Sequence, residues 1–393
     1  VLKDMTTSTN NTIKPVCPLC EHDNYLPVYV PQNSFLNAVV HLCSRCAYVG
    51  LITSGIPSQN RFRPNILSCD ADYSTIRVGK EQMLEQSWNM ISKFVDLVQC
   101  KKVLDLSSAR GHFARRILSE IEFVEITCLE PDEYMTHDYS SLENLKMIRS
   151  SYELEMEIDK FDLIYSCHSL EHYRSPLGNL RLMLHHLSPE GLIYLEVPNA
   201  EAMTSGFVLE EFFYDQHKSY FFEPVLCSAI RAMGFEICHT QTDSGSIRLI
   251  LKGNGKQETR TTEDASRSLL IRSQVESYAE RLSINRRSLP SIISGWELDS
   301  PNKSMGVVGC GRMLDALITY GGLKVNDETQ LYDSILSKIE YFKRGNQVLP
   351  LSSITANRPD QVVIAANSSL KQLYKLVKEL SPNSEVFSIV MDA

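Results

Sequence analysis

The chain has no run of about 20 apolar residues, the length that crosses a lipid bilayer, so we expect no membrane helix or membrane partner. It also has no cluster of basic residues, because 39 Lys and Arg and 48 Asp and Glu give a diffuse net charge of −9. We therefore expect no nucleic acid partner, whose phosphates would need grouped basic side chains. The polar N-terminal segment lacks the apolar core of an export signal, which favours a cytoplasmic protein.

Cysteine is present, but its spacing is not typical of a disulfide framework. Of the 11 cysteines, four form two C-x-x-C pairs separated by 22 residues, and the others are scattered. Two such pairs predict a tetrahedral zinc site, although disulfides and unrelated thiols remain alternatives. Four thiolates leave no open coordination position, so we predict a structural Zn²⁺ held by Cys17, Cys20, Cys43 and Cys46.

Changes in composition and hydrophobic periodicity divide the chain into four parts. Residues 15–75 show little helical periodicity and hold the cysteine pairs, which indicates a small zinc lobe. Residues 76–255 alternate β-branched runs with amphipathic stretches, as in a parallel sheet covered by helices. Residues 256–302 begin as a polar linker and continue as a helical arm, and residues 303–393 restart the alternation. The predicted class is α/β, with a Rossmann-like domain, a small four-cysteine zinc lobe and a second, C-terminal Rossmann-like domain.

Hydrophobic periodicity also places individual elements in these parts. Helices are expected over residues 81–98, 111–119, 176–187 and about 267–289. Strands are expected over residues 102–106, 125–129, 161–165, 192–197, 305–308, 330–332, 362–365 and 386–390.

Residues 103–113, VLDLSSARGHF, predict a strand, a tight turn and a helix start. Asp105 lies at the end of this strand, where a carboxylate can accept hydrogen bonds from a ligand. Glu130 follows Gly111 by about 19 residues at the end of the next strand, where an acid can hold both ribose hydroxyls. Because Gly111 is the one glycine of the turn, the segment alone equally fits an ordinary strand–helix junction.

The segment FFYDQHKSYF, residues 212–221, combines titratable and aromatic side chains. Tyr214 and His217 could offer two titratable groups to one small cavity, and histidine is the natural general base near neutral pH. The segment is also typical of a packed aromatic loop in which His217 has a structural role. His172 lies just beyond a predicted strand end, and is either a third catalytic residue or a surface residue.

The succession of these segments resembles the Rossmann-like S-adenosylmethionine methyltransferases, of class I architecture. The resemblance implies S-adenosylmethionine as the cofactor, with its methionine part near Gly111 and its adenine near residues 150–152. Ser107 stands where the family usually carries glycine. The cofactor-binding residues that we predict are Tyr73, Asp105, Ser107, Gly111, Glu130, Ser151 and His168.

The order of parts over roughly residues 17–390 resembles, more narrowly, the sugar C-methyltransferases. The most specific matches are the cysteine pairs, residues 214–221 and residues 245–248. This resemblance implies methylation at C3 of a nucleotide-linked 4-keto-6-deoxy sugar. His217 would be the base that forms an enolate, Tyr214 would stabilise the enolate oxygen, and the C-terminal domain would help to hold the nucleotide. Gln216 stands where the family carries a carboxylate.

Three other functions stay open at this point. The changed residue Gln216 keeps an O- or N-methyltransferase for a sugar or small metabolite in consideration. Residues 306–311, GVVGCG, followed about 22 residues later by Asp333, could belong to a nicotinamide-dependent oxidoreductase, although Leu314 replaces the third glycine of that fingerprint. Ser107 and Gln216 together would also fit a noncatalytic nucleotide-binding protein with a decayed methyltransferase domain.

Overall fold

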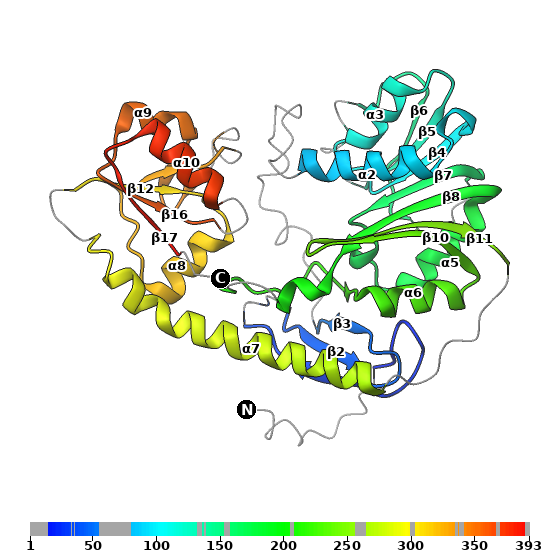
Figure 1. Cartoon of the computed structure of the whole chain (residues 1–393), viewed down its shortest axis with the longest axis horizontal. Helices are drawn as coiled ribbons and strands as arrows, with labels where there is room; N and C mark the ends of the chain where they lie inside the picture. Colours follow the sequence, from blue (N-terminus) through cyan, green and yellow to red (C-terminus); the bar gives the residue numbers. More distant parts are fainter. Residues whose placement is uncertain are drawn as a thin grey trace.

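The structure, a computed structural model, contains three β-sheets and a long connecting helix (Figure 1). The predicted α/β class is confirmed: a Rossmann-like sheet, a lobe with the four paired cysteines, and a second parallel sheet. Within the part of the chain that the structure describes, no helix combines the length and apolar character needed to cross a membrane. That part comprises residues 15–32, 34, 36–54, 80–131, 136, 139–152, 158–204, 208–255, 265–298, 303–334, 337, 342–366 and 370–389.

The N-terminal lobe is an antiparallel sheet completed by a strand from much later in the chain. Val49 pairs with Tyr220, and Gly50 pairs with Ser219. A side chain at Gly50 would collide with the Tyr25 hydroxyl, so glycine permits this close pairing. The strand order is β1 (Tyr25–Tyr29), β2 (Val39–Cys43), β3 (Val49–Ile52) and β9 (Ser219–Tyr220).

The central sheet has seven strands in the order β10-β11-β8-β7-β4-β5-β6. Strand β11 is antiparallel to both of its neighbours, and the remaining strands run in one direction. Their bounds are β4 (Lys102–Leu106), β5 (Glu125–Leu129), β6 (Leu145–Ile148), β7 (Phe161–Cys167), β8 (Leu187–Pro198), β10 (Phe235–Thr242) and β11 (Ser246–Gly253).

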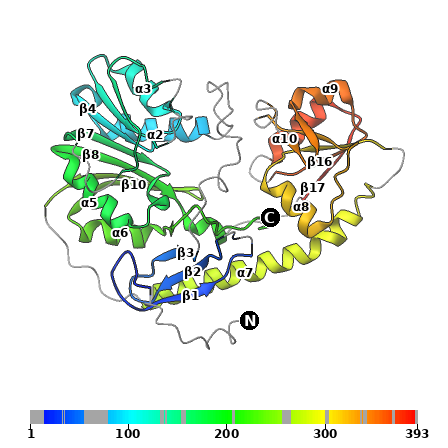
Figure 2. The ribbon, with the colours of Figure 1, turned by 180° about the vertical axis from the view of Figure 1, so that it is seen from behind.

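Helices cover both faces of the central sheet, which is why its strands read as continuous apolar runs (Figure 2). Successive side chains of a strand point to opposite faces. Accordingly, Val103 belongs to the apolar cluster of one helix pair, and Leu104 to the cluster of the other pair. The pairs are α2 (Lys80–Phe94) with α3 (His112–Glu120), and α5 (Pro176–His186) with α6 (Glu223–Ala232).

A 30-residue helix, α7 (Ala265–Ser294), runs from the N-terminal lobe to the C-terminal sheet (Figure 1). At about 1.5 Å per residue it spans roughly 45 Å. Ser268 near its start donates to the carbonyl of Cys43 at 3.4 Å, and Leu289 near its end packs in the apolar cluster of helix α8 (Arg312–Gly321). The helix continues through Pro290, beyond its predicted end.

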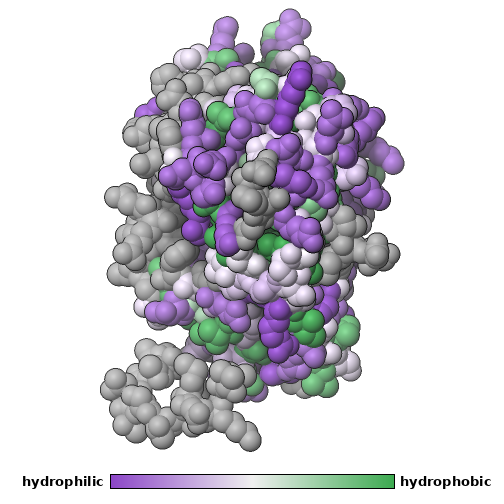
Figure 3. All heavy atoms as spheres, turned by 90° about the vertical axis from the view of Figure 1, so that its left-hand side faces the viewer, coloured by the Kyte–Doolittle hydropathy of each residue, from purple (hydrophilic) through white to green (hydrophobic). Residues whose placement is uncertain are grey.

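The C-terminal sheet has the strand order β14-β15-β13-β12-β16-β17, with β14 antiparallel to β15 and the others parallel. Helix α8 packs on one face and α10 (Leu370–Leu380), with the short α9 (Ile354–Asn357), on the other. The strands are β12 (Met305–Val308), β13 (Gln330–Tyr332), β14 (Phe342–Lys343), β15 (Asn346–Leu349), β16 (Gln361–Ile364) and β17 (Glu385–Ser388). On the coloured surface of this end of the molecule, hydrophilic side chains predominate and hydrophobic ones form small groups (Figure 3).

Candidate active site

The carboxyl end of β4 is the switch point of the central sheet, because β5 and β7 flank it on opposite sides. Ligands of open α/β sheets bind in the crevice at such a point. Asp105 of β4, Glu130 directly after β5 and His168 directly after β7 lie at this edge. Three predicted site residues from three strands are thus brought to one edge.

The turn after β4 has a left-handed backbone at three positions. The φ angle is 55° at Ser107, 44° at Ala109 and 67° at Gly111. Left-handed backbone favours glycine, which explains why a glycine is usual at the position of Ser107. Here the Ser107 hydroxyl is bound instead by the Ser169 hydroxyl at 2.8 Å. A Cβ on Gly111 would lie 2.5 Å from the ring of Tyr139, so packing and backbone both require this glycine.

Asp105 and Glu130 form a buried acidic pair beside this turn. Glu130 accepts the backbone N–H of Ala109 at 3.0 Å. Asp105 is 1% exposed, and its Oδ2 has no hydrogen-bond partner among the described residues. Burial, followed by the charge of Glu130, raises the pKa of Asp105 well above its ordinary value. A buried carboxyl oxygen without a partner indicates a place for a donor from a ligand.

Of the other two predicted cofactor residues, the structure describes one. Tyr73 lies outside the described residues. Ser151 is exposed in the segment after β6, next to the buried Tyr152.

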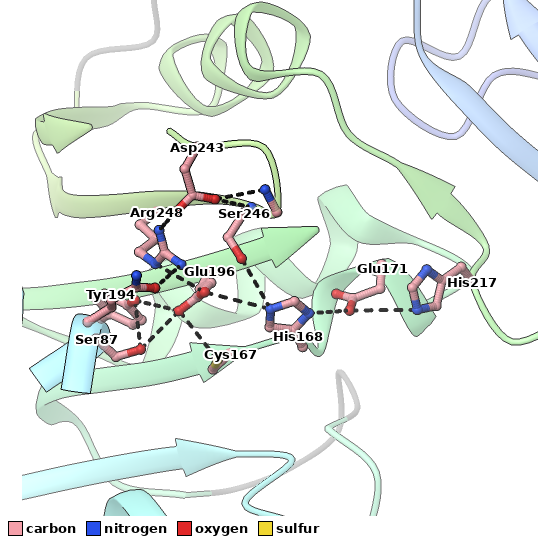
Figure 4. Close-up of polar contacts among 12 residues, drawn as sticks. Ser87, Cys167, His168, Glu171, Tyr194, Glu196, His217, Asp243, Ser246 and Arg248 are labelled. Atoms are coloured by element: carbon pink, nitrogen blue, oxygen red, sulfur yellow. Dashed lines mark hydrogen bonds and ion pairs between the residues drawn. The ribbon is translucent and has the colours of Figure 1, made fainter. Parts of the chain in front are cut away.

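His168 lies between two buried carboxylates (Figure 4). Its Nδ1 is 3.6 Å from Glu171 Oε1, and its Nε2 is 3.6 Å from Glu196 Oε1. Glu196 is also bound by the Tyr194 hydroxyl at 2.6 Å and pairs with Arg248 Nε at 3.1 Å. Burial lowers the pKa of His168, but the contacts with both carboxylates outweigh burial and raise it to about 9. His168 is therefore a cation at neutral pH.

Sequence reasoning missed three members of this network, Glu171, Glu196 and Arg248. A signal existed for two of them, since Glu196 and Arg248 are charged residues within otherwise apolar strands. Charged side chains are rarely fully buried unless they are paired. Which residues they pair with depends on the antiparallel register of β11 and β8, where Arg248 lies opposite Glu196.

The predicted pair of Tyr214 and His217 is brought together by a tight turn. The N–H of His217 donates to the carbonyl of Tyr214 at 3.1 Å, and the Tyr214 hydroxyl lies 2.6 Å from His217 Nε2. Burial raises the pKa of Tyr214 to about 12 and lowers the pKa of His217 to about 4. Both groups are therefore neutral near pH 7. The third predicted residue, His172, is adjacent, with its ring 4.9 Å from that of His217.

The N-terminal lobe and α7 hold this turn in place. Glu211 accepts hydrogen bonds from the hydroxyls of Tyr29 at 2.9 Å and Tyr278 at 2.6 Å. Asp215 accepts a hydrogen bond from Ser34 at 2.5 Å. Strand β9, which pairs with β3 of the lobe, begins two residues after His217. The position of the turn thus depends on the lobe that carries the four paired cysteines.

The four cysteines are gathered in a geometry compatible with a metal ion. The Sγ atoms of Cys17 and Cys46 lie 3.6 Å apart, and those of Cys20 and Cys43 lie 3.5 Å apart. Sulfurs bound to a tetrahedral zinc at 2.3 Å would be about 3.8 Å apart. Both pairs adopt the same turn, in which the residue after the second cysteine donates its N–H to the carbonyl of the first.

A cavity of about 790 Å³ lies between the Tyr214–His217 turn, α7 and α8, with Tyr214 and Gln216 in its wall. Arg286 of α7 is 6% exposed, and its Nη2 has no hydrogen-bond partner among the described residues. Arg312 of α8 pairs with Glu210 at 3.1 Å, and its guanidinium lies 5.1 Å from the centre of the Tyr214 ring. The cavity therefore brings two cations close to the predicted catalytic pair.

In the C-terminal sheet, the chain's own side chains bind the turn considered for a dinucleotide. The N–H of Cys310 donates to Asp333 at 3.1 Å. The amine of Lys343 donates to the carbonyls of Cys310 at 2.8 Å and Gly311 at 3.3 Å.

Residues 84–240 match the family of methyltransferase domains. The match identifies this region as a methyltransferase domain. It contains the switch point of the central sheet, the buried acidic pair and the Tyr214–His217 turn. A search of curated proteins finds no match to the chain.

Solved structures with similarity to the chain include other methyltransferases. The structure of DhpI with S-adenosylhomocysteine is 12% identical, covers 49% of this chain and 94% of its own, and has a TM-score of 0.39. An S-adenosylmethionine-dependent methyltransferase from Mesorhizobium loti is 17% identical over 43% of this chain and 99% of its own, with a TM-score of 0.37. The N-terminal domain of EvdMO1 with S-adenosylhomocysteine is 16% identical, covers 44% of this chain and 80% of its own, and has a TM-score of 0.32.

The methyltransferase domain has a local geometry that fits its cofactor. The partnerless oxygen of buried Asp105 can take a donor from a ligand, and the N-terminus of helix α3 begins directly after Gly111 at the same edge of the sheet. We expect Asp105 and Gly111 near the methionine part and Glu130 on the ribose hydroxyls.

Replacing Glu130 tests this placement. We expect Glu130→Gln to weaken S-adenosylhomocysteine binding by about 10- to 100-fold, because hydrogen bonds to a charged group are worth about 1.5–3 kcal/mol. Isothermal titration calorimetry measures the effect. Glu125→Gln is the matched control, since Glu125 is exposed at the opposite end of β5. Equal affinities in both variants would contradict the placement.

Proposed function

We propose that this methyltransferase methylates a carbon atom beside the ketone of a nucleotide-linked keto-deoxysugar. The observation that carries the proposal is the 2.6 Å contact between the Tyr214 hydroxyl and His217 Nε2. A neutral imidazole can accept a proton from carbon, and an adjacent phenol can donate a hydrogen bond to the oxygen that becomes negative. Methyl transfer to an oxygen or nitrogen atom forms no enolate, so it does not use a hydrogen-bond donor to an enolate oxygen.

In this proposal the substrate carbonyl takes over the hydrogen bond of Tyr214, which frees Nε2 of His217. The carbon–hydrogen bond breaks, the proton moves to Nε2, and the electron pair forms an enolate. The bound cofactor supplies a methyl group from its sulfonium, so that the carbon–carbon bond forms as the sulfur–methyl bond breaks. His217 then releases its proton to solvent. The rate depends mainly on holding the two reactants in line.

The cavity beside Tyr214 supports an anionic, nucleotide-linked acceptor. The four acidic side chains of its wall already have partners: Glu210 pairs with Arg312, Glu211 binds Tyr278, Asp215 binds Ser34 and Asp315 pairs with Lys343. The partnerless Nη2 of Arg286 is then a donor for a phosphate oxygen, and the exposed guanidinium of Arg312 in the same cavity wall is a second. A phosphate here would place the sugar close to Tyr214.

Arg312→Ala tests the phosphate assignment. Arg312 is 65% exposed and neutralises no buried carboxylate, so its loss should leave the fold intact. We expect KM for the nucleotide sugar to rise about tenfold, the cost of one charge-assisted hydrogen bond, with a smaller change in kcat. Steady-state kinetics measure both. Arg358→Ala, at an exposed position after α9, should leave KM unchanged, and a similar KM in both variants would contradict the assignment.

The acceptor class is tested by label transfer from methyl-labelled S-adenosylmethionine. We expect transfer to nucleotide-linked 4-keto-6-deoxy sugars and none to the matching 4-hydroxy sugars, because a hydroxyl does not acidify the neighbouring carbon. Transfer to the 4-hydroxy sugars would indicate an O-methyltransferase and would contradict the proposal.

We further propose that the four paired cysteines bind a structural zinc ion.

A further inference from the structure

Glu171 is a buried carboxylate whose burial is not compensated by hydrogen bonds to its oxygens among the described residues. It lies in a short 3-10 turn (Leu170–His172) directly after β7 and is 1% exposed. Neither of its carboxylate oxygens has a hydrogen-bond partner among the described residues. Its backbone carbonyl, by contrast, accepts the N–H of Lys218 at 2.7 Å, which fixes the turn against the Tyr214–His217 loop. Burying a carboxylate in this way costs free energy, so a compensating interaction is expected.

Three imidazoles surround the Glu171 carboxylate at ion-pair distances, and Figure 4 shows two of them, His168 and His217, on either side of it. From Oε1 the distances are 3.6 Å to His168 Nδ1, 3.8 Å to His172 Nε2 and 4.0 Å to His217 Nε2. The Nδ1 of His172 is bound to the carbonyl of Gln216 at 3.1 Å, so its Nε2 is turned toward Glu171. The carboxylate therefore faces the same atom of His217 that contacts Tyr214.

Glu171 carries its charge near neutral pH. Burial raises its pKa, but His168 and the nearby His172 and His217 outweigh burial, so that the pKa lies below its ordinary value. For His217 the balance is the reverse: burial, followed by the neighbouring His172, His168 and Arg312, lowers the pKa, whereas Glu171 raises it. Among the groups that shift the pKa of His217, Glu171 is thus the one that raises it and favours the protonated imidazole.

We propose that Glu171 is a positioning residue, whose carboxylate stabilises the imidazolium that His217 becomes when it takes the substrate proton. The inference rests on the proposed function, since it assigns the base to His217. A carboxylate 4.0 Å from the base favours the charged product of proton abstraction without touching the substrate. Its interaction is stronger after proton transfer than before, so it lowers the barrier and leaves substrate binding almost unchanged.

The first test is Glu171→Gln, which removes the charge and keeps the size. We expect kcat to fall about 100-fold, within the range for loss of a charge partner in acid–base catalysis, with KM and the Kd of S-adenosylhomocysteine within about twofold. Glu171→Asp, which keeps the charge, should recover part of kcat. Glu190→Gln is the control, because Glu190 is an exposed carboxylate on β8. Unchanged kcat in Glu171→Gln, or equal kcat in the Gln and Asp variants, would overturn the inference.

A spectroscopic readout separates electrostatic positioning from structural support. In NMR titrations of the histidine ring protons, His168 should titrate near pH 9 in the unmodified protein and at lower pH in Glu171→Gln. His217 should titrate below its own value of about 4 in that variant. A folded variant with both titrations unchanged would overturn the inference. If Glu171→Gln does not fold, Glu171→Asp decides instead. Its shorter side chain holds the charge farther from the imidazoles, so His168 should titrate below pH 9 and kcat should be lower than in the unmodified protein. A Glu171→Asp protein with the titration and kcat of the unmodified protein would overturn the inference.

Two further outcomes have distinct meanings. Full activity of His217→Ala would refute the proposed function, whereas an inactive His217→Ala with a fully active Glu171→Gln would refute only the role of Glu171.

The ligand types of Glu171, His172 and His217, within 4.8 Å of one another, would also suit a metal ion. A second metal ion per chain that is lost in Glu171→Gln would replace the positioning role by metal binding.

Discussion

His217→Ala should lower kcat for methyl transfer by about 100- to 10,000-fold, the usual contribution of a general base. The imidazole lies within hydrogen-bond distance of the Tyr214 hydroxyl, and its removal takes away the base assigned to the carbon-bound proton. Binding of S-adenosylhomocysteine should stay nearly unchanged, because the cofactor is expected at the ends of β4 and β5. Single-turnover kinetics with methyl-labelled cofactor measure the effect directly.

The matched control for this variant is His185→Ala. His185 is an exposed residue of α5, so its replacement should leave kcat unchanged. The pH dependence is a second check. Burial lowers the pKa of His217 to about 4, so the base should remain neutral, and kcat should be retained, until the pH falls toward 4. Turnover by His217→Ala at the unmodified rate would contradict the base assignment.

Cys43→Ser should abolish binding of the proposed zinc ion and reduce both stability and activity. Loss of one thiolate opens the tetrahedral site, and the free energy of zinc binding is folding free energy for a small lobe with little core of its own. We expect a loss of roughly 3 kcal/mol in the free energy of unfolding of the lobe. Activity should fall more than tenfold, because β3 of the lobe pairs with β9, which follows the Tyr214–His217 turn.

Metal analysis and thermal unfolding test this prediction together. The unmodified protein should contain one zinc ion per chain, and Cys43→Ser should contain much less. Cys238→Ser is the control, since Cys238 is an exposed thiol on β10 outside the cysteine cluster. A Cys43→Ser protein with full stability and activity would show that the lobe does not need the metal.

The elements that could be predicted are those whose signal is local. Strand β4 begins and ends as predicted, because Val103, Leu104 and Leu106 form a short apolar run and a turn follows it directly. The cysteine pairs also predicted their own clustering, since each pair lies within one turn. The helix expected over residues 81–98 ends at Phe94 and is followed by a 3-10 turn (Leu97–Gln99).

The parts that could not be predicted depend on contacts between distant segments. Strand β9 has only two residues and exists because β3 lies beside it. The network of Glu171, Glu196 and Arg248 requires the register of β8 and β11 and the approach of a separate loop. The sequence places Tyr214 near His217, but only the fold shows that a buried carboxylate faces both.

The position of the transferred methyl group tests the central claim most directly. The product formed from a nucleotide-linked 4-keto-6-deoxy sugar and ¹³C-methyl-labelled S-adenosylmethionine can be examined by NMR. The account predicts a labelled methyl group bonded to the carbon beside the ketone, with that carbon's original proton lost to solvent. A labelled methyl group on oxygen or nitrogen, or a product that retains that proton, would contradict it.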